Sequence, residues 1–518
     1  MKGTHRGLLA VGIPTLILIA SAIRLYRSPW SASHLHVTPD SVEYAVCAQR
    51  LASLHTYDLV IEGISYPPRY PPWFSALILL PAYLLDPGEL GIGIIPVLLC
   101  SLAGVLAAYR IGARIGGEWG GAAACVCLVS SGVYRPWSRE IMTDVPAAAL
   151  GLWALYAFLL LREGVGGRRA WLSGALLSAG AFLLRSEYAI LFVPFGVEAL
   201  RSKEHRWSRL LVVTVPFVCA LLATFADHLR SFGDAFRSGY QFWTPVPCDY
   251  PGMLVSVANV GPNLANLFGP WALPDLILGA VGIAVILARR SAAGLHSIKF
   301  LVLGALPVSC AHLPLLFLDA RFHVLSLSIL CILGGSGIVL LLPQHFRSVA
   351  WIVPLVGAPL AIALPRAPDP VPTRRIAAEA LARVLPDDAV VISAIDPVYL
   401  EAIVVRGTKR RVVPVDREVE YASQAVARTR IAHPVPFPSG PGDHRSPGLL
   451  AAGARDVCAF TAEEDPERLA AWVRDGVPVY VDLSFRPRKV PTARLRALGI
   501  EIESLPRESW IGRLRQTR

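Results

Sequence analysis

Charged residues are scarce in this chain: Asp, Glu, Lys and Arg make up only 17% of its 518 residues. A soluble globular protein carries about 25%. Hydrophobic residues make up 54%, and the mean hydropathy is +0.51. The shortage of charge excludes an ordinary soluble enzyme, and the abundance of apolar residues excludes a disordered chain. A polytopic membrane protein is the class that remains.

Ligand-like cysteine pairs are missing, because the nine cysteines include no Cys-x-x-Cys. Cys47, Cys248 and Cys458 lie in polar segments, and their odd number argues against a full disulfide framework. The other six fall in apolar runs, where we expect them to pack as small hydrophobic residues. These are Cys100, Cys125, Cys127, Cys219, Cys310 and Cys331.

Acidic residues are outnumbered, with 38 Asp and Glu against 49 Lys and Arg, so the net charge is +11. In a membrane protein such an excess usually sits in cytoplasmic loops. We therefore expect membrane lipids, and no nucleic acid, as partners of the chain.

Long apolar runs predict eleven membrane spans. The first, 7–23, is interpreted as an uncleaved anchor, although Ala20-Ser21-Ala22 resembles a signal-peptidase site. The others are 90–109, 117–133, 145–161, 170–184, 187–200, 208–226, 271–288, 298–318, 322–342 and 348–364.

Basic clusters near residues 110, 165, 205, 290 and 347 orient these spans. All five face the cytoplasm only if the short apolar segment 72–85 does not cross the membrane. We therefore predict that 72–85 is an interfacial or re-entrant helix on the outer side. The N-terminus is then cytoplasmic, and the C-terminus lies outside.

The composition changes near residue 366, after a proline-rich stretch that suits a stiff linker. We predict a transmembrane domain over 1–365 and a separately folding extracytoplasmic domain over 366–518. Helices expected near 373–385 and 463–475 alternate with strands at 389–395 and 477–483, which indicates an α/β domain. The predicted fold class is thus an α-helical polytopic membrane protein with a small C-terminal α/β domain.

The acidic residues that could take part in a reaction lie in the predicted outer loops. Within the predicted spans, His312 is the one ionisable residue that lies well inside an apolar run. That scarcity counts against an ion-coupled transporter. Asp40 follows Thr38 and Pro39, which suit a helix start, and we predict an amphipathic helix over 39–54 on the membrane surface. The spacing alone leaves Asp40 either a helix-dipole acid or a catalytic base.

Three further residues have both a structural and a functional interpretation. Asp144 stands at the start of a predicted span. Glu43 and Tyr44 follow Asp40 by one helical turn, where they could orient a substrate.

Three arginines are candidates for binding phosphate. Arg69 lies in a proline-rich turn, Tyr66-Pro67-Pro68-Arg69-Tyr70-Pro71-Pro72, while Arg185 and Arg321 lie in turns beside spans. Each could instead be an interfacial anchor. His34 and His36 form a His-x-His pair without a third ligand, so we predict no metal site and leave a divalent metal open.

Taken in chain order, these motifs resemble the GT-C superfamily of membrane glycosyltransferases. The most similar members are protein mannosyltransferases that use dolichyl-phosphate-mannose and aminoarabinose transferases that use undecaprenyl-phosphate sugars. The resemblance covers most of residues 1–345. Its pieces are Asp40 with Tyr44, Tyr66–Pro72, Asp144, Leu183–Glu187 and Arg321-Phe322.

The resemblance implies a hexosyl- or pentosyltransferase on the outer face of the bacterial plasma membrane. A sugar would pass from a polyprenyl-phosphate donor to a hydroxyl of a glycan, lipid or protein acceptor, with inversion. No nucleotide cofactor is implied. The implied catalytic residues are Asp40, Asp144 and Glu43, and the donor-binding residues are Arg69, Arg185, Arg321, Tyr44 and Tyr70.

The sequence departs from these relatives at two positions. Ser41 follows Asp40 where many relatives have a second acid, and Tyr70 stands where some have Lys. Two other classes stay open: a lipid or polysaccharide transporter, and an inactive scaffold of an envelope-assembly complex. A transporter should carry charged residues along a path through its spans, and a scaffold should tolerate loss of Asp40.

Overall fold

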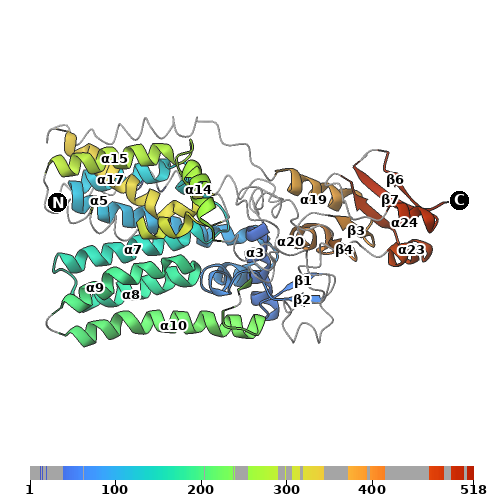
Figure 1. The fold of residues 1–518 in the computed structure, drawn as a ribbon, viewed down its shortest axis with the longest axis horizontal. Helices are drawn as coiled ribbons and strands as arrows, with labels where there is room; N and C mark the ends of the chain where they lie inside the picture. The colour runs from blue at the N-terminus through green and yellow to red at the C-terminus, as the bar shows by residue number, and fades with distance from the viewer. Residues whose placement is uncertain are drawn as a thin grey trace. The chain divides into compact units, whose positions relative to one another are not determined.

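The computed structural model of the chain contains two compact units (Figure 1). It describes residues 39–61, 64–202, 205–236, 238–239, 255–289, 306–315, 319–342, 372–393, 397–414, 466–483, 492–506 and 510–517, and also Gly12, Thr15, Ile19 and Ile298. The helical unit takes the described residues of Met1–Trp30, Trp73–Ala226 and Val255–Ala367, and the loop–tail unit takes those of Ser31–Pro72, Asp227–Leu254 and Pro368–Arg518.

Helices make up nearly all of the helical unit. Its main helices are α5 (Ile94–Ser130), α7 (Asp144–Arg162), α8 (Gly167–Leu184), α9 (Phe192–Arg201), the first 21 residues of α10 (Arg206–Phe232), α15 (Leu273–Ala288) and α17 (Val324–Leu341). Short elements between them are η1 (Ser75–Leu79), α4 (Leu80–Leu85), η2 (Leu90–Gly93), α6 (Tyr134–Trp137), η3 (Ser186–Leu191), η4 (Val257–Asn259), α14 (Val260–Leu267) and η5 (Ala320–His323).

The element labelled α5 is two helices that fold back on each other. Its backbone leaves the helical region at Gly116 and Gly117, where Gly117 has a φ of 71°. A Cβ on Gly112 would lie 2.7 Å from the Cβ of Ala124, and the Cys125 thiol donates to the Val105 carbonyl at 3.3 Å. This reversal agrees with two predicted spans, 90–109 and 117–133.

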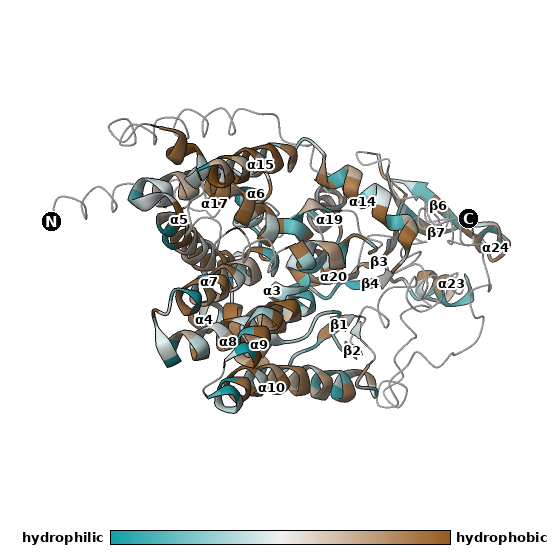
Figure 2. Cartoon of the chain, turned by 60° about the vertical axis from the view of Figure 1, so that its left-hand side comes forward, coloured by the Kyte–Doolittle hydropathy of each residue, from teal (hydrophilic) through white to brown (hydrophobic). Residues whose placement is uncertain are grey.

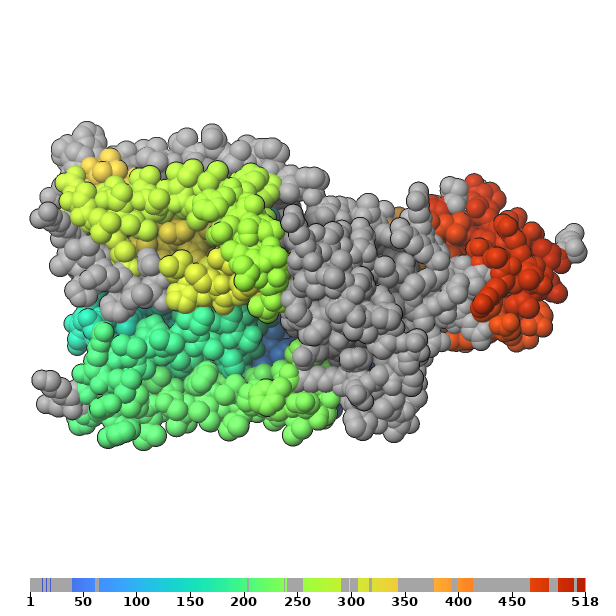
Figure 3. Space-filling view, viewed as in Figure 1, coloured from blue at the N-terminus to red at the C-terminus, as the bar shows by residue number. Residues whose placement is uncertain are grey.

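Four stretches of the described chain are long and apolar enough to cross a membrane: Leu90–Ser130, Asp144–Arg162, Arg206–Phe232 and Ala320–Leu341. Figure 2 shows hydrophobic residues along α7, α10 and α15, and Figure 3 shows α10 and α15 at the surface of the helical unit. The exposed apolar residues of α10 recur at helical spacing, as expected of a face in contact with lipid: Leu211, Val215, Val218 and Leu222.

Segment 72–85 forms one short helix, with η1 running directly into α4. Its residues Ser75–Leu85 are apolar. At 1.5 Å per residue it is about 16 Å long, roughly half the thickness of the hydrocarbon core. The length agrees with the predicted helix that does not cross. The predicted span 348–364 and nearly all of span 7–23 lie outside the described residues.

The loop–tail unit combines the first loop with the tail of the chain. The first loop gives helix α3 (Pro39–Leu54) and an antiparallel hairpin of β1 (Leu59–Ile61) and β2 (Ile64–Tyr66). The tail gives a five-stranded sheet of order β4-β3-β5-β7-β6. Its strands are β3 (Val390–Ser393), β4 (Arg411–Pro414), β5 (Val479–Asp482), β6 (Ile500–Ser504) and β7 (Ile511–Gln516).

The sheet is parallel over β4, β3 and β5 and antiparallel over β7 and β6. Its side chains form a core with Leu469 and Leu495 from the neighbouring helices. The other elements of the tail are α19 (Pro372–Val384), α20 (Pro397–Tyr399), η7 (Leu400–Val405), α23 (Pro466–Arg474) and α24 (Thr492–Ala497). The predicted α/β character of the tail is thus confirmed.

Helix α3 has the predicted bounds, but its surroundings differ from the prediction. Residues 40–45, 47 and 48 are all buried, so the helix is not an amphipathic helix with one exposed face. The reason is tertiary packing, because α20 lies against both α3 and β1 and contributes the buried side chains Val398 and Tyr399.

Candidate active site

Asp40 lies in the first turn of α3, where the helix dipole favours a negative charge. Its side chain is buried, and the Arg69 guanidinium, also buried, approaches it with Nη1 at 3.8 Å from Asp40 Oδ1. A carboxylate withdrawn from water needs such a compensating cation. The pair therefore places a buried carboxylate beside a group that can bind an anion.

Glu43 holds the Arg69 backbone in position. Glu43 Oε1 accepts hydrogen bonds from the backbone N–H groups of Arg69 and Tyr70, the latter at 3.3 Å. Its other oxygen, Oε2, lies 3.9 Å from Arg69 Nε. Because one oxygen is engaged by the turn and the other faces the guanidinium, the geometry favours a positioning role for Glu43 over proton transfer.

The proline-rich turn is fixed by two tyrosines. The Tyr44 ring stacks on the Tyr70 ring with centroids 4.6 Å apart. The Tyr57 hydroxyl bonds to the carbonyls of Tyr70 and Pro71 at 2.9 and 3.0 Å. Gly239 packs so closely that a Cβ there would lie 2.1 Å from the Arg69 carbonyl. Rotation of this turn, and hence of Arg69, is restricted on several sides.

A second ion pair joins α3 to its hairpin. Arg50 binds both oxygens of Asp58, at 2.8 and 2.9 Å, and the Ser65 hydroxyl donates to the same carboxylate at 2.6 Å. Partial burial alone would raise the pKa of Asp58, but the hydrogen bonds from Arg50 and Ser65 outweigh it and lower that pKa below its usual value. Asp58 therefore stays ionised near neutral pH and ties the hairpin to α3.

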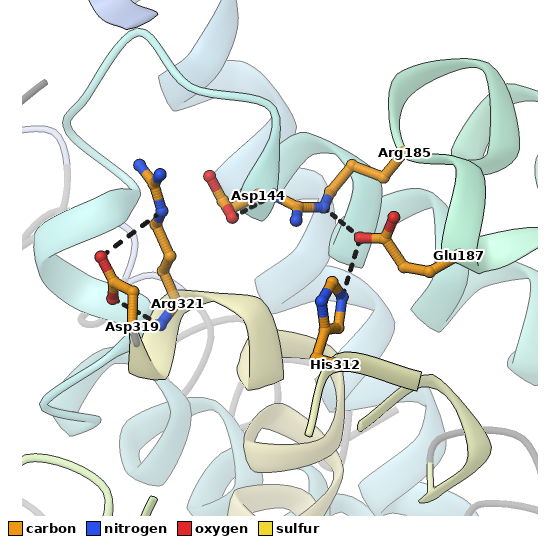
Figure 4. A network of polar contacts seen from close by, with 6 residues as sticks. All are labelled: Asp144, Arg185, Glu187, His312, Asp319 and Arg321. Atoms are coloured by element: carbon orange, nitrogen blue, oxygen red, sulfur yellow. Dashed lines mark hydrogen bonds and ion pairs between the residues drawn. The ribbon is translucent and has the colours of Figure 1, made fainter. Parts of the chain in front are cut away.

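The helical unit contains its own polar network, shown in Figure 4. Asp144, in the first turn of α7, is completely buried, and Arg185 Nη1 donates to its Oδ1. Arg185 Nε donates to Glu187 Oε1, and His312 Nε2 lies 3.0 Å from that same oxygen. Arg185 is thus engaged by two carboxylates, which favours an orienting role over free access to a phosphate.

Arg321 lies at the other side of this network in Figure 4. Its Nε is 3.5 Å from Asp319 Oδ2, and its guanidinium lies 5.0 Å from the ring centroids of both Trp137 and Phe322. Cation–π contacts of this kind hold an arginine without using its hydrogen-bond donors. Arg321 is thus held by one carboxylate and two aromatic rings, whereas Arg185 is held by two carboxylates.

The structure brings the sequence-predicted residues together in two groups. Asp40, Glu43, Tyr44, Arg69 and Tyr70 meet in the loop–tail unit. Asp144, Arg185 and Arg321 belong to the helical unit, where Arg185 and Arg321 share the Phe322 ring.

Sequence reasoning missed three contributors. No sequence motif includes Tyr57, whose partners Tyr70 and Pro71 follow 13 and 14 positions later, or Gly239, which approaches the distant Arg69. His312 had a signal, as an isolated ionisable residue in an apolar run, but its partner Glu187 is 125 positions away.

Among the described residues, no group of three His, Cys, Asp or Glu side chains is arranged to hold a metal ion. His34 and His36 lie outside the described residues. The cysteines that the structure describes are free thiols.

Comparison with known proteins gives one sequence match and several structural matches. The family described as dolichyl-phosphate-mannose-protein mannosyltransferase matches residues 69–229. No curated protein matches the sequence.

Solved structures resemble the chain over nearly its whole length. One is ArnT from Cupriavidus metallidurans bound to undecaprenyl phosphate, with a TM-score of 0.57, 14% identity, and coverage of 96% of this chain and 97% of that chain. A second is the Archaeoglobus fulgidus oligosaccharyltransferase tethered with an acceptor peptide, with a TM-score of 0.53, 12% identity, and coverage of 99% and 74%.

A third is the archaeal oligosaccharyltransferase AglB from Archaeoglobus fulgidus in complex with an inhibitory peptide and a dolichol-phosphate. Its TM-score is 0.53 at 11% identity, with coverage of 98% of this chain and 74% of that chain. These matches confirm the resemblance that the sequence motifs predict.

Proposed function

We propose that this chain, whose fold is that of the GT-C membrane glycosyltransferases, moves a sugar from a polyprenyl-phosphate donor to an acceptor hydroxyl. The observation that carries the proposal is the buried Asp40–Arg69 pair in a chain of this fold. It supplies a carboxylate for a proton and a cation for a phosphate, the two groups that the reaction requires.

The proposed reaction is one displacement. The acceptor oxygen attacks the anomeric carbon, the bond from that carbon to the phosphate oxygen breaks, and the lipid phosphate leaves with the bonding electrons. Asp40 takes the hydroxyl proton, which is worth about 10²–10⁴-fold in rate. Arg69 stabilises the charge that develops on the leaving phosphate. Attack opposite the leaving group inverts the anomeric configuration.

The structural neighbours support a lipid-linked donor. One of them was solved with undecaprenyl phosphate, and another with a dolichol-phosphate and a peptide. Both lipids carry the kind of phosphate that Arg69 would bind. The hexosyl or pentosyl nature of the sugar and the acceptor, whether a glycan, a lipid or a protein, can be identified by mass spectrometry of surface glycoconjugates from a deletion strain.

The alternatives make different demands on the chain. A transporter should show charged side chains along its spans, whereas the ionic network of the helical unit gathers at one end of α7. An inactive scaffold has no need of a buried carboxylate–arginine pair. Measuring transfer from purified polyprenyl-phosphate sugars in nanodiscs separates both alternatives from the enzyme.

Arg69→Ala is expected to raise the KM for the lipid donor at least about tenfold, because a hydrogen bond to a charged group is worth roughly 1.5–3 kcal/mol. Donor titrations in the nanodisc assay measure the effect. Arg496→Ala removes an exposed arginine of the same unit and serves as the matched control. An unchanged KM in a folded Arg69→Ala protein would contradict a phosphate-binding role.

Charge also supports the proposed orientation at the plasma membrane of a bacterium. Arg114 pairs with Glu163, and Arg162 pairs with Glu198 at 2.7 Å. These contacts gather the α5 reversal, the α7–α8 turn and the end of α9 at one end of the helical unit. Asp144 lies at the opposite end of α7, about 28 Å away for 19 residues.

A reporter that is active only outside the cytoplasm tests this orientation. Fused after residue 140 or 380 it should be active, and fused after residue 165 or 205 it should be silent, because basic loops stay in the cytoplasm. Immunoblots of each fusion control for expression. Activity at 165 would invert the topology and remove Asp144 from the outer face.

A further inference from the structure

The end of the helix at 306–312 brings an imidazole into the ionic network of the helical unit. His312 is buried, and its Nε2 lies 3.0 Å from Glu187 Oε1. That oxygen also accepts from Arg185 Nε, and Arg185 Nη1 donates to Asp144 Oδ1. Figure 4 shows these four side chains in one connected line.

In this hydrogen-bonded chain, Glu187 and Asp144 hold the guanidinium of Arg185 from two sides. Rotation of Arg185 would break its bond to Glu187 or its bond to Asp144, and buried ionic bonds of this kind are costly to break. The Phe322 ring limits the same guanidinium, at 5.0 Å from its Cζ. The His312 ring also stacks on Phe322, with centroids 5.1 Å apart and planes 15° apart.

Only one carboxylate oxygen of Asp144, Oδ1, takes part in this hydrogen-bonded chain. Asp144 is completely buried, and its Oδ2 has no hydrogen-bond partner among the described residues. A buried acceptor without a donor costs about 1–3 kcal/mol, and more when it is charged. An oxygen left in this state is suited to accept a hydrogen bond from a hydroxyl of a bound substrate.

We infer that His312 and Glu187 are positioning residues for Asp144. His312 holds the Glu187 carboxylate, Glu187 holds the Arg185 guanidinium, and Arg185 holds Asp144 Oδ1 so that Oδ2 accepts from a substrate hydroxyl. The inference rests on the proposed transfer reaction, because the substrate hydroxyl comes from it. It explains why a polar ring occupies an otherwise apolar run of the sequence.

Two substitutions of His312 separate a hydrogen-bonding role from a packing role. His312→Phe keeps a ring against Phe322 and removes the donor to Glu187. His312→Gln removes the ring and keeps an N–H at about the position of Nε2. His323→Phe is the matched control, since the His323 ring is also buried and 6.1 Å from His312 but has no hydrogen bond to another described residue.

The full chain in nanodiscs is assayed for transfer and for thermal unfolding. We expect His312→Phe to lower kcat about tenfold or more, because a charge-assisted hydrogen bond is lost, with the KM for the lipid donor unchanged. His312→Gln should recover most of that loss, and His323→Phe should stay near the wild type. Nearly normal kcat in His312→Phe, or a larger loss in His312→Gln than in His312→Phe, would overturn the inference.

The contact between His312 and Glu187 can also be tested by a measurement that does not depend on the proposed function. If the wild type transfers no sugar, the unfolding midpoints of His312→Phe, Glu187→Gln and the double variant still form a cycle. Side chains in contact give effects that are not additive, whereas independent ones add. If the changes in unfolding midpoint add, the interaction between His312 and Glu187 is overturned, whatever reaction the protein catalyses. If they do not add, the interaction is supported.

Discussion

Asp40→Asn is expected to lower the rate of sugar transfer at least about 100-fold, from the lower end of what a general base contributes. Asparagine has nearly the shape of aspartate but cannot take a proton from the acceptor hydroxyl. Donor binding should persist, because Arg69 remains in place through the hydrogen bonds from its backbone and that of Tyr70 to Glu43.

The fold should tolerate this substitution. Asp40 lies in the first turn of α3, where a neutral amide loses a dipole interaction of about 0.3–1 kcal/mol. Arg69 keeps an acidic neighbour, since Glu43 Oε2 lies 3.9 Å from its Nε. A loss of transfer can therefore be attributed to chemistry when the unfolding midpoint changes little.

The measurement compares kcat for wild type, Asp40→Asn and Asp388→Asn in nanodiscs, with a polyprenyl-phosphate sugar as donor. Asp388 is an exposed aspartate of the same unit, so its substitution controls for a general change of charge. Near-normal turnover by a folded Asp40→Asn protein would remove Asp40 from the mechanism. Asp144 would then be the next base to test, followed by Glu43.

The bounds of helix α3 were predicted correctly because local sequence signals define them. Pro39 suits the first helical position and Asp40 the first turn, and the observed helix is Pro39–Leu54. The same signals could not show that the helix is buried, because one of the elements that pack against it, α20, lies more than 340 positions later. The burial of residues 40–45, 47 and 48 depends on tertiary packing.

In the candidate site, too, the sequence indicates the residue types but not their contacts. Charge and proline content drew attention to Arg69 and Glu43, but the sequence could not show that Glu43 binds the backbone of Arg69, which is 26 positions away. Arg185 was predicted as a phosphate ligand, but the sequence could not show that it pairs with Asp144, which is 41 positions away. Residue type predicts the chemistry available, whereas these partners are set by the fold.

Tyr399→Ala is expected to reduce transfer at least about tenfold, although Tyr399 belongs to the tail and is far from Asp40 in the sequence. Helix α20 packs against α3 and β1, and the side chain of Tyr399 is buried. Loss of a buried aromatic ring typically costs about 3–5 kcal/mol. The cavity would loosen α3, and small displacements of a catalytic group can cost about 100-fold in rate.

Hydrogen exchange of residues 39–54 measures this loosening directly. Faster exchange is expected in Tyr399→Ala than in the wild type, because α3 loses part of its covering. Leu495→Ala is the matched control, as Leu495 is fully buried in the core of the tail sheet, in a cluster that does not include Tyr399. It should destabilise the tail while exchange in α3 stays close to that of the wild type.

The comparison of these two variants decides what the tail contributes. A tail that acts only on the acceptor would leave α3 protected in both variants and would change acceptor KM rather than kcat. A tail that supports the Asp40 helix gives a fall in kcat together with faster exchange in α3, in Tyr399→Ala alone. Equal loss of transfer in both variants, with α3 still protected, would contradict support through α20.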